Sequence, residues 1–151
     1  MKTYLTALVF AATLIASPAA APNSAPTAAD TTVSPSAAKD SRCFEMRTYY
    51  AMPGKFEAMH ARFRDHTCAL FKKHGMELVG FWIPTDKDKG ADKTLVYILA
   101  HKSRDEAKKS WAAFSSDPEW KKAREASEAN GKIVEKADVV FMSATDYSPM
   151  K

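Results

Sequence analysis

Three side chains that can do chemistry recur at every second position early in the chain: Glu45, Arg47 and Tyr49. The residues between them are apolar or β-branched, and this alternation predicts a β-strand within the stretch Cys43 to Gly54. A carboxylate, a guanidinium and a phenol on one strand face can line a polar cavity. A solvated sheet face with an ordinary ion pair is the alternative, and the sequence leaves both open.

A second polar set comes from the stretch Thr94 to His101, whose alternation predicts another strand. Glu45 and His101 are the candidate proton acceptors, because a carboxylate or imidazole in a closed apolar cavity can have its pKa moved toward neutrality. Four further residues are candidates for binding an anionic or aromatic substrate: Arg47, Tyr49, Trp82 and Tyr97. The opposing interpretation is that Glu45 and Arg47 pair structurally and that the aromatic residues only pack.

The histidines do not predict a metal site. His60, His66 and His74 lie on or beside the apolar stripe of a helix expected over residues 55–73, but no two are four positions apart. The chain also lacks Cys-x-x-Cys and His-Glu-x-x-His. We therefore expect no metal and no cofactor, with haem held by an axial histidine as a minor alternative.

The N-terminus predicts export. Residues 1–21 combine a basic start, a short apolar run and small residues, as in a cleaved signal peptide. The run is too short for a membrane span, which takes about 20 apolar residues, so we expect no stable span in the mature chain. Residues 22–41 are rich in Pro, Ala, Ser and Thr and predict a disordered linker. The mature protein is expected in the periplasm or the medium.

Two cysteines, Cys43 and Cys68, belong to this exported chain, where a disulfide can persist. Cys68 lies about 21 Å along the expected helix from the turn at Gly54, at 1.5 Å per residue. Cys43 lies about 23 Å back along the strand, at 3.3 Å per residue. The heights match, so a disulfide between them is possible, and the sequence does not decide it.

The charge pattern argues against nucleic acid as a partner. The formal net charge is +4, and Lys and Arg alternate with Asp and Glu without an arginine-rich stripe. The sequence also lacks Gly-x-Ser-x-Gly and a glycine-rich phosphate loop, so no activated nucleophile or phosphate site is indicated.

The elements expected to position these residues follow the order βαββαβ. A helix over 55–73 follows the first strand, strands over 76–83 and 94–101 form a hairpin, a helix begins at Ser103 and restarts at Asp117, and the last strand covers 133–144. This is the ferredoxin-like, or split βαβ, arrangement of an α+β protein. Its helices cover one sheet face, so the other face is expected to pair with a second copy in a two-fold dimer that encloses a cavity.

Several motifs then carry a resemblance. Phe-Glu-Met-Arg-Thr-Tyr-Tyr-Ala-Met-Pro-Gly-Lys-Phe, Phe-x-Lys-His-Gly-Met-Glu-Leu-Val-Gly-Phe-Trp, Asp-Pro-Glu-Trp and Ala-Thr-Asp-Tyr-Ser-Pro occur in this order over about residues 44–149. Together they resemble the NIPSNAP family of dimeric α/β-barrel proteins. The resemblance implies a domain over residues 42–151 that pairs as a dimeric barrel. The family has no generally assigned reaction, so no catalytic residue carries over.

Two functions follow as hypotheses. The first is an exported homodimeric domain of unassigned activity that binds a small molecule in the dimeric barrel cavity. The alternative is a cofactor-independent monooxygenase or isomerase-type enzyme, which the wider barrel superfamily includes. The hypotheses differ in whether Glu45, Arg47, Tyr49 and His101 converge in one enclosed site.

Overall fold

A computed structural model describes residues 33–151. The predicted signal peptide and residues 22–32 of the predicted linker lie outside the described residues. The elements are β1 (Cys43–Ala51), α1 (Phe56–Arg62), a π-helical turn η2 (Phe63–Thr67), α2 (Cys68–Lys73), β2 (Glu77–Trp82), a short 3-10 turn η3 (Lys87–Lys89), β3 (Thr94–His101), α3 (Arg104–Ser116), α4 (Pro118–Ser127) and β4 (Val134–Ser143). The predicted ferredoxin-like α+β order is confirmed.

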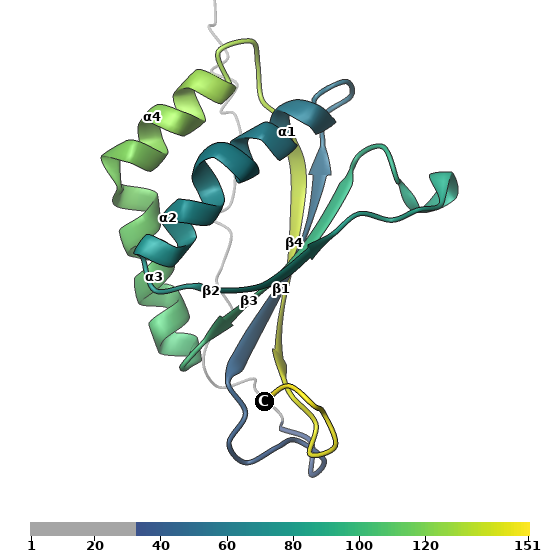
Figure 1. The fold of residues 1–151 in the computed structure, drawn as a ribbon, viewed down its shortest axis with the longest axis vertical. Helices are drawn as coiled ribbons and strands as arrows, with labels where there is room; N and C mark the ends of the chain where they lie inside the picture. Colours follow the sequence, from purple (N-terminus) through teal and green to yellow (C-terminus); the bar gives the residue numbers. More distant parts are fainter. Residues whose placement is uncertain (1–32) are drawn as a thin grey trace, which may run out of the picture. The chain divides into compact units, whose positions relative to one another are not determined.

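The four strands form one antiparallel sheet in the order β2-β3-β1-β4. Figure 1 shows α1 to α4 on one side of this sheet, and no α-helix of residues 33–151 lies on the other. Alternation along β1 places Glu45 and Tyr49 on the helix-covered face and Phe44 and Met46 on the open face. The register confirms the sorting, because Glu45 is paired with Leu99, and both are fully buried.

Local sequence signals fix the helix ends. The Ser103 hydroxyl accepts a hydrogen bond from the Glu106 amide at 3.2 Å and caps α3, as the sequence predicts. The Asp117 carboxylate accepts one from the Glu119 amide at 2.7 Å and caps α4, with proline at the first helical position. Gly75 ends α2 with a φ of 74°, which suits glycine.

The first helix is not a plain α-helix. Five residues, Phe63–Thr67, form a π turn between α1 and α2, which the apolar periodicity did not predict. The Thr67 hydroxyl donates a hydrogen bond to the Arg62 carbonyl at 3.1 Å and so partners a backbone oxygen beside the wider turn. A π turn accommodates one extra residue and shifts every later side chain around the helix axis.

The open sheet face carries large apolar side chains. Val140 is 47% exposed and Trp82 is 50% exposed. The indole of Trp82 lies against Gly80, where an added Cβ would come within 2.6 Å of the ring. The register of β2 also shifts between Leu78 and Gly80, so this glycine combines the bulge and the close approach that its position in a strand suggests.

The structure differs from the sequence prediction over residues 33–41. The predicted linker includes them, yet Ala37 bridges Thr145, and the Ala38 amide donates to the Ala144 carbonyl at 2.8 Å. The segment is polar and has little apolar area to bury, but these backbone hydrogen bonds hold it along the C-terminal residues. Among residues 33–151, no helix is both long and apolar enough to cross a membrane.

Candidate functional site

A buried carboxylate lies at the centre of the candidate site. The Glu45 side chain is fully buried on the helix-covered face, and its two oxygens accept three hydrogen bonds. Oε1 accepts from Arg47 Nε at 2.7 Å, while Oε2 accepts from Trp111 Nε1 at 2.7 Å and is 2.9 Å from His101 Nε2. Three elements, β1, β3 and α3, therefore meet at one carboxylate.

These partners keep the carboxylate charged. Burial alone would raise the pKa of Glu45, but the hydrogen bond from His101 and the charge of Arg47 outweigh it, with Trp111 adding, so the pKa is lowered below its ordinary value. A general base that works near neutral pH needs a raised pKa. Glu45 is instead built to remain an anion that orients its three donors.

His101 is oriented by the same contact. Because the pKa of Glu45 is lowered, its side chain is an ionised carboxylate that can only accept, so His101 Nε2 carries the proton. The opposite ring nitrogen, Nδ1, is buried and has no hydrogen-bond partner among the described residues. The buried Tyr97 hydroxyl makes no hydrogen bond of normal geometry within the same residues. Burial raises its pKa well above the ordinary value, with the neighbouring Tyr49 hydroxyl adding to the effect.

Arg47 connects this buried network to solvent. Its guanidinium lies over the Trp111 ring at 3.6 Å from the ring centre, which is a close cation–π contact. Nε donates a hydrogen bond to Glu45, and Nη1 donates a longer one, of 3.4 Å, to the Tyr49 hydroxyl. No residue within the described part of the chain accepts a hydrogen bond from Nη2, and the side chain keeps 18% exposure.

The exit is next to β4, because the helix layer does not cover this edge strand. Val139 is the register partner of Arg47 and lies on the helix side of the sheet, yet it is 43% exposed. Phe141, the partner of Glu45, is only half-buried there, with the Arg104 guanidinium 4.5 Å from its ring centre. The site thus has an aromatic and aliphatic rim beside Arg47, and a second guanidinium, that of Arg104, lies on the aromatic part of the rim.

Most of the residues proposed from the sequence share this side of the sheet, and one does not. Glu45, Arg47, Tyr49, Tyr97 and His101 lie between the sheet and the helices. Trp82 lies on the open face, against Gly80. A cavity between two open sheet faces would therefore be lined by Trp82 and not by the other five, because alternation sends them to the opposite face.

Trp111 is the network member that sequence reasoning missed. Its place on the apolar stripe of α3, beside Ala107 and Phe114, predicts core packing, and it does contact Phe71 and Phe114. The available signal is chemical: a largely buried indole N–H needs an acceptor, and in the structure Glu45 provides it.

The cysteines are both free thiols in this structure. Cys43 begins β1 beside its register partners His101 and Ser143, and Cys68 lies on the other side of the helix-covered core, near Phe81. Burial raises the pKa of both thiols, so neither is an activated nucleophile. Across residues 33–151, no three His, Cys, Asp or Glu side chains come together as a metal site would require.

Known proteins match both the sequence and the fold. Residues 44–149 match the NIPSNAP family. No curated protein matches the sequence. Among solved structures, a NIPSNAP family protein of unknown function from Agrobacterium tumefaciens is 24% identical, with a TM-score of 0.65 over 76% of this chain and 98% of the other.

Two further structures agree with this match. A second NIPSNAP family protein from A. tumefaciens is 18% identical, with a TM-score of 0.62 over 72% of this chain and 98% of its own. A NIPSNAP-like domain protein from Burkholderia xenovorans is 15% identical, with a TM-score of 0.60 over 71% of this chain and 88% of its own. The family match spans well over half of the chain and the fold is shared, so this protein belongs to the NIPSNAP family.

Proposed function

We propose that this protein is an exported, homodimeric binding domain for a small organic anion, which it holds at Arg47. The observation that carries the proposal is the asymmetric environment of that guanidinium. One edge is fixed by the buried Glu45 carboxylate and one face by Trp111, while Nη2 has no acceptor among the described residues. A cation held in place before binding meets a carboxylate with little loss of side-chain entropy.

The surroundings of Arg47 favour an anion that also has an apolar part. Val139 and Phe141 present aliphatic and aromatic surface beside it, and the Trp111 ring supports it from α3. A single carboxylate with an aromatic or aliphatic body fits the Arg47 guanidinium and the apolar rim beside it. This ligand site lies inside each protomer, in contrast to the cavity between sheets that the sequence predicted.

Nuclear magnetic resonance with benzoate as the probe tests the site. We expect saturable shifts of the Arg47 Nε–H and Trp111 Nε1–H signals, because the probe would sit on the guanidinium that Trp111 supports. The double variant Glu45→Gln/Arg47→Met removes both charges together, so no buried charge is left unpaired, and it should abolish the shift of Trp111 Nε1–H, which is the signal that remains. A saturable shift of Trp111 Nε1–H that persists in the double variant would refute the site.

The dimer rests on the open sheet face, which carries exposed apolar residues such as Val140 and Trp82. Val140→Asp would place a charge on the open face, between the paired sheets, and should yield monomers in sedimentation experiments. Val139→Asp is the matched control: it is a neighbouring, equally exposed valine on the opposite face, so the dimer should survive. Equal behaviour of the two variants would contradict pairing through this face.

An isomerase or cofactor-independent monooxygenase is the second candidate, and one observation favours it. His101 Nδ1 is a buried nitrogen with no hydrogen-bond partner among residues 33–151. Glu45 fixes the tautomer of His101 that leaves the lone pair of Nδ1 free. In this role His101 and not Glu45 would accept a proton. Turnover of a bound anion that His101→Asn abolishes, without loss of binding, would support the enzyme over the binding domain.

A further inference from the structure

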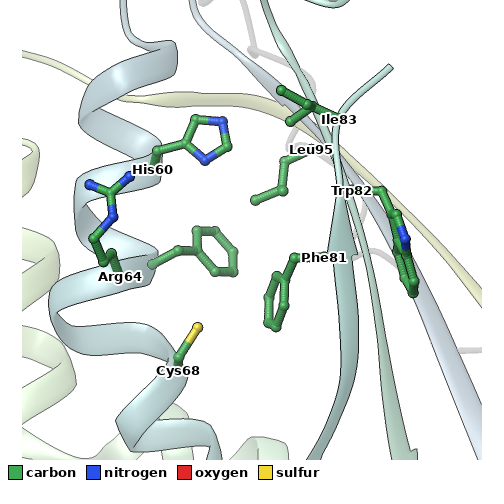
Figure 2. A pocket seen from close by; sticks show the side chains of 8 residues that line it. His60, Arg64, Cys68, Phe81, Trp82, Ile83 and Leu95 are labelled. Carbon is green, nitrogen blue, oxygen red and sulfur yellow. The ribbon is translucent and has the colours of Figure 1, made fainter. Parts of the chain in front are cut away.

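A second cavity lies on the other side of the helix-covered core, away from Arg47. It has a volume of about 290 Å³ and is bounded by the first helix and by the ends of β2 and β3. Figure 2 shows His60 and Cys68 on the helix wall, facing Phe81 and Leu95, which point toward them from the strands. The lining residues are His60, Phe63, Arg64, Cys68, Phe81, Trp82, Ile83 and Leu95.

The π turn builds the helix wall of this cavity. An α-helix turns about 100° per residue, so residues eight positions apart normally point about 80° apart. The extra residue of the π turn brings His60 and Cys68 to within about 20° of each other around the helix. Without this turn, Cys68 would leave the cavity wall. The irregularity that sequence periodicity missed is thus what shapes the cavity.

The residues that line the cavity are mostly apolar, and the charged one among them is basic. Phe63 and Leu95 are buried at the base, and no acidic residue lines the cavity. Arg64 is exposed at the edge of the cavity and forms no hydrogen bond or ion pair with another residue between 33 and 151. His60 is half-buried, with its ring edge-on to Phe56 at 4.4 Å between ring centres. The cavity therefore offers an apolar interior and a basic edge.

We propose that this cavity is a second ligand site, which takes an amphiphilic monoanion with its apolar body against Phe63, Phe81 and Leu95 and its acidic group at Arg64. Its 290 Å³ has room for roughly ten non-hydrogen atoms at about 30 Å³ for each water-sized group. Octanoate has this size and charge pattern. Cys68 lines the cavity as a neutral thiol, because burial raises its pKa, and it reports on occupancy.

The test uses protection of Cys68 from alkylation by iodoacetamide, followed by mass spectrometry. Cys43→Ser makes Cys68 the only cysteine, since the chain has two. We expect octanoate to protect Cys68 saturably and the uncharged 1-octanol to bind at least about fivefold more weakly, because a charge-assisted hydrogen bond is lost. Arg64→Gln should weaken octanoate by a similar factor and leave 1-octanol unchanged. Lys87→Gln, which removes an exposed charge outside the cavity lining, should change neither.

Three results would overturn the proposal. The first is no protection at about 10 mM octanoate, a concentration that would occupy most of a site with a Kd of about 1 mM. The second is equal affinity for octanoate and 1-octanol. The third is protection that survives Arg64→Gln but is lost in Glu45→Gln/Arg47→Met, which would assign the anion to the Arg47 site. Octanoate protection that is retained in this double variant keeps the two sites separate.

Discussion

Replacing Glu45 by glutamine tests the buried network with the smallest change of shape. The amide oxygen can take the place of Oε2 and keep the hydrogen bonds from His101 and Trp111. The amide nitrogen then faces Arg47 Nε, so two donors oppose each other where a 2.7 Å ion pair existed. Turning the amide over only moves the conflict, because the NH₂ group would then face both His101 and Trp111.

The magnitude follows from burial. Breaking a buried ion pair costs about 3–5 kcal/mol, whereas a hydrogen bond to a charged group contributes about 1.5–3 kcal/mol. Arg47 keeps 18% exposure, so water can partly solvate it in the variant and the loss falls between these ranges. We expect Glu45→Gln to lower the free energy of unfolding by about 2–4 kcal/mol. That is a large share of the 5–15 kcal/mol typical of a single domain.

Urea unfolding of the wild type, Glu45→Gln, Arg47→Met and the double variant forms a complete cycle. The double variant should be more stable than the sum of the single losses predicts, with a coupling of at least about 1.5 kcal/mol. The surface pair Lys136 and Asp138 is the control, because both side chains are solvent-accessible and should show no measurable coupling. Additive losses at Glu45 and Arg47 would refute the network as a coupled unit.

The remaining predictions concern pH and the open sheet face. Because the pKa of Glu45 is lowered in the folded state, the ionised side chain stabilises the fold above pH 4.5, and this effect is lost as the pH falls through the folded-state pKa. The difference in free energy of unfolding between the wild type and Glu45→Gln should therefore shrink in acid. Asp117→Asn keeps the cap of α4 but removes the carboxylate. Hydrogen bonds from Lys73 and His74 hold the pKa of that carboxylate far below its usual range, so it is ionised at pH 7. The variant should therefore have a lower Tm than the wild type at pH 7, and the two Tm values should converge only in strong acid. Gly80→Ala should displace the half-exposed Trp82 ring and shift its fluorescence, and an unchanged emission spectrum would contradict the close approach.

The fold was predictable because its signals are local. The alternation over β1 and β3, the cap residues Ser103 and Asp117, and the turn glycine Gly75 each act through their immediate neighbours, and all appear in the structure. The π turn was not predictable in this way. The stripe of apolar side chains predicts a continuous helix whether or not a turn holds one extra residue. Whether the π turn forms depends on tertiary packing around Thr67.

The candidate site was predictable only in part. Alternation placed Glu45, Arg47 and Tyr49 on one face, but nothing local decides which face the helices cover. The ligand cavity was expected between two sheets because the helices leave one sheet face uncovered. The contact from Trp111 depends on how α3 lies across β1, a long-range property of the packing. Trp82 was grouped with the site by residue type alone, and the register shift beside Gly80 helps direct its ring to the open face.

The most direct test of the proposed function is native mass spectrometry of the mature protein beside the Glu45→Gln/Arg47→Met variant, each purified gently from the periplasm or medium to which we propose it is exported. We predict a wild-type dimer that carries a reproducible extra mass, and a variant dimer without it. A monomer would contradict pairing through the open sheet face. An extra mass that the variant retains would contradict the assignment of the ligand to Arg47.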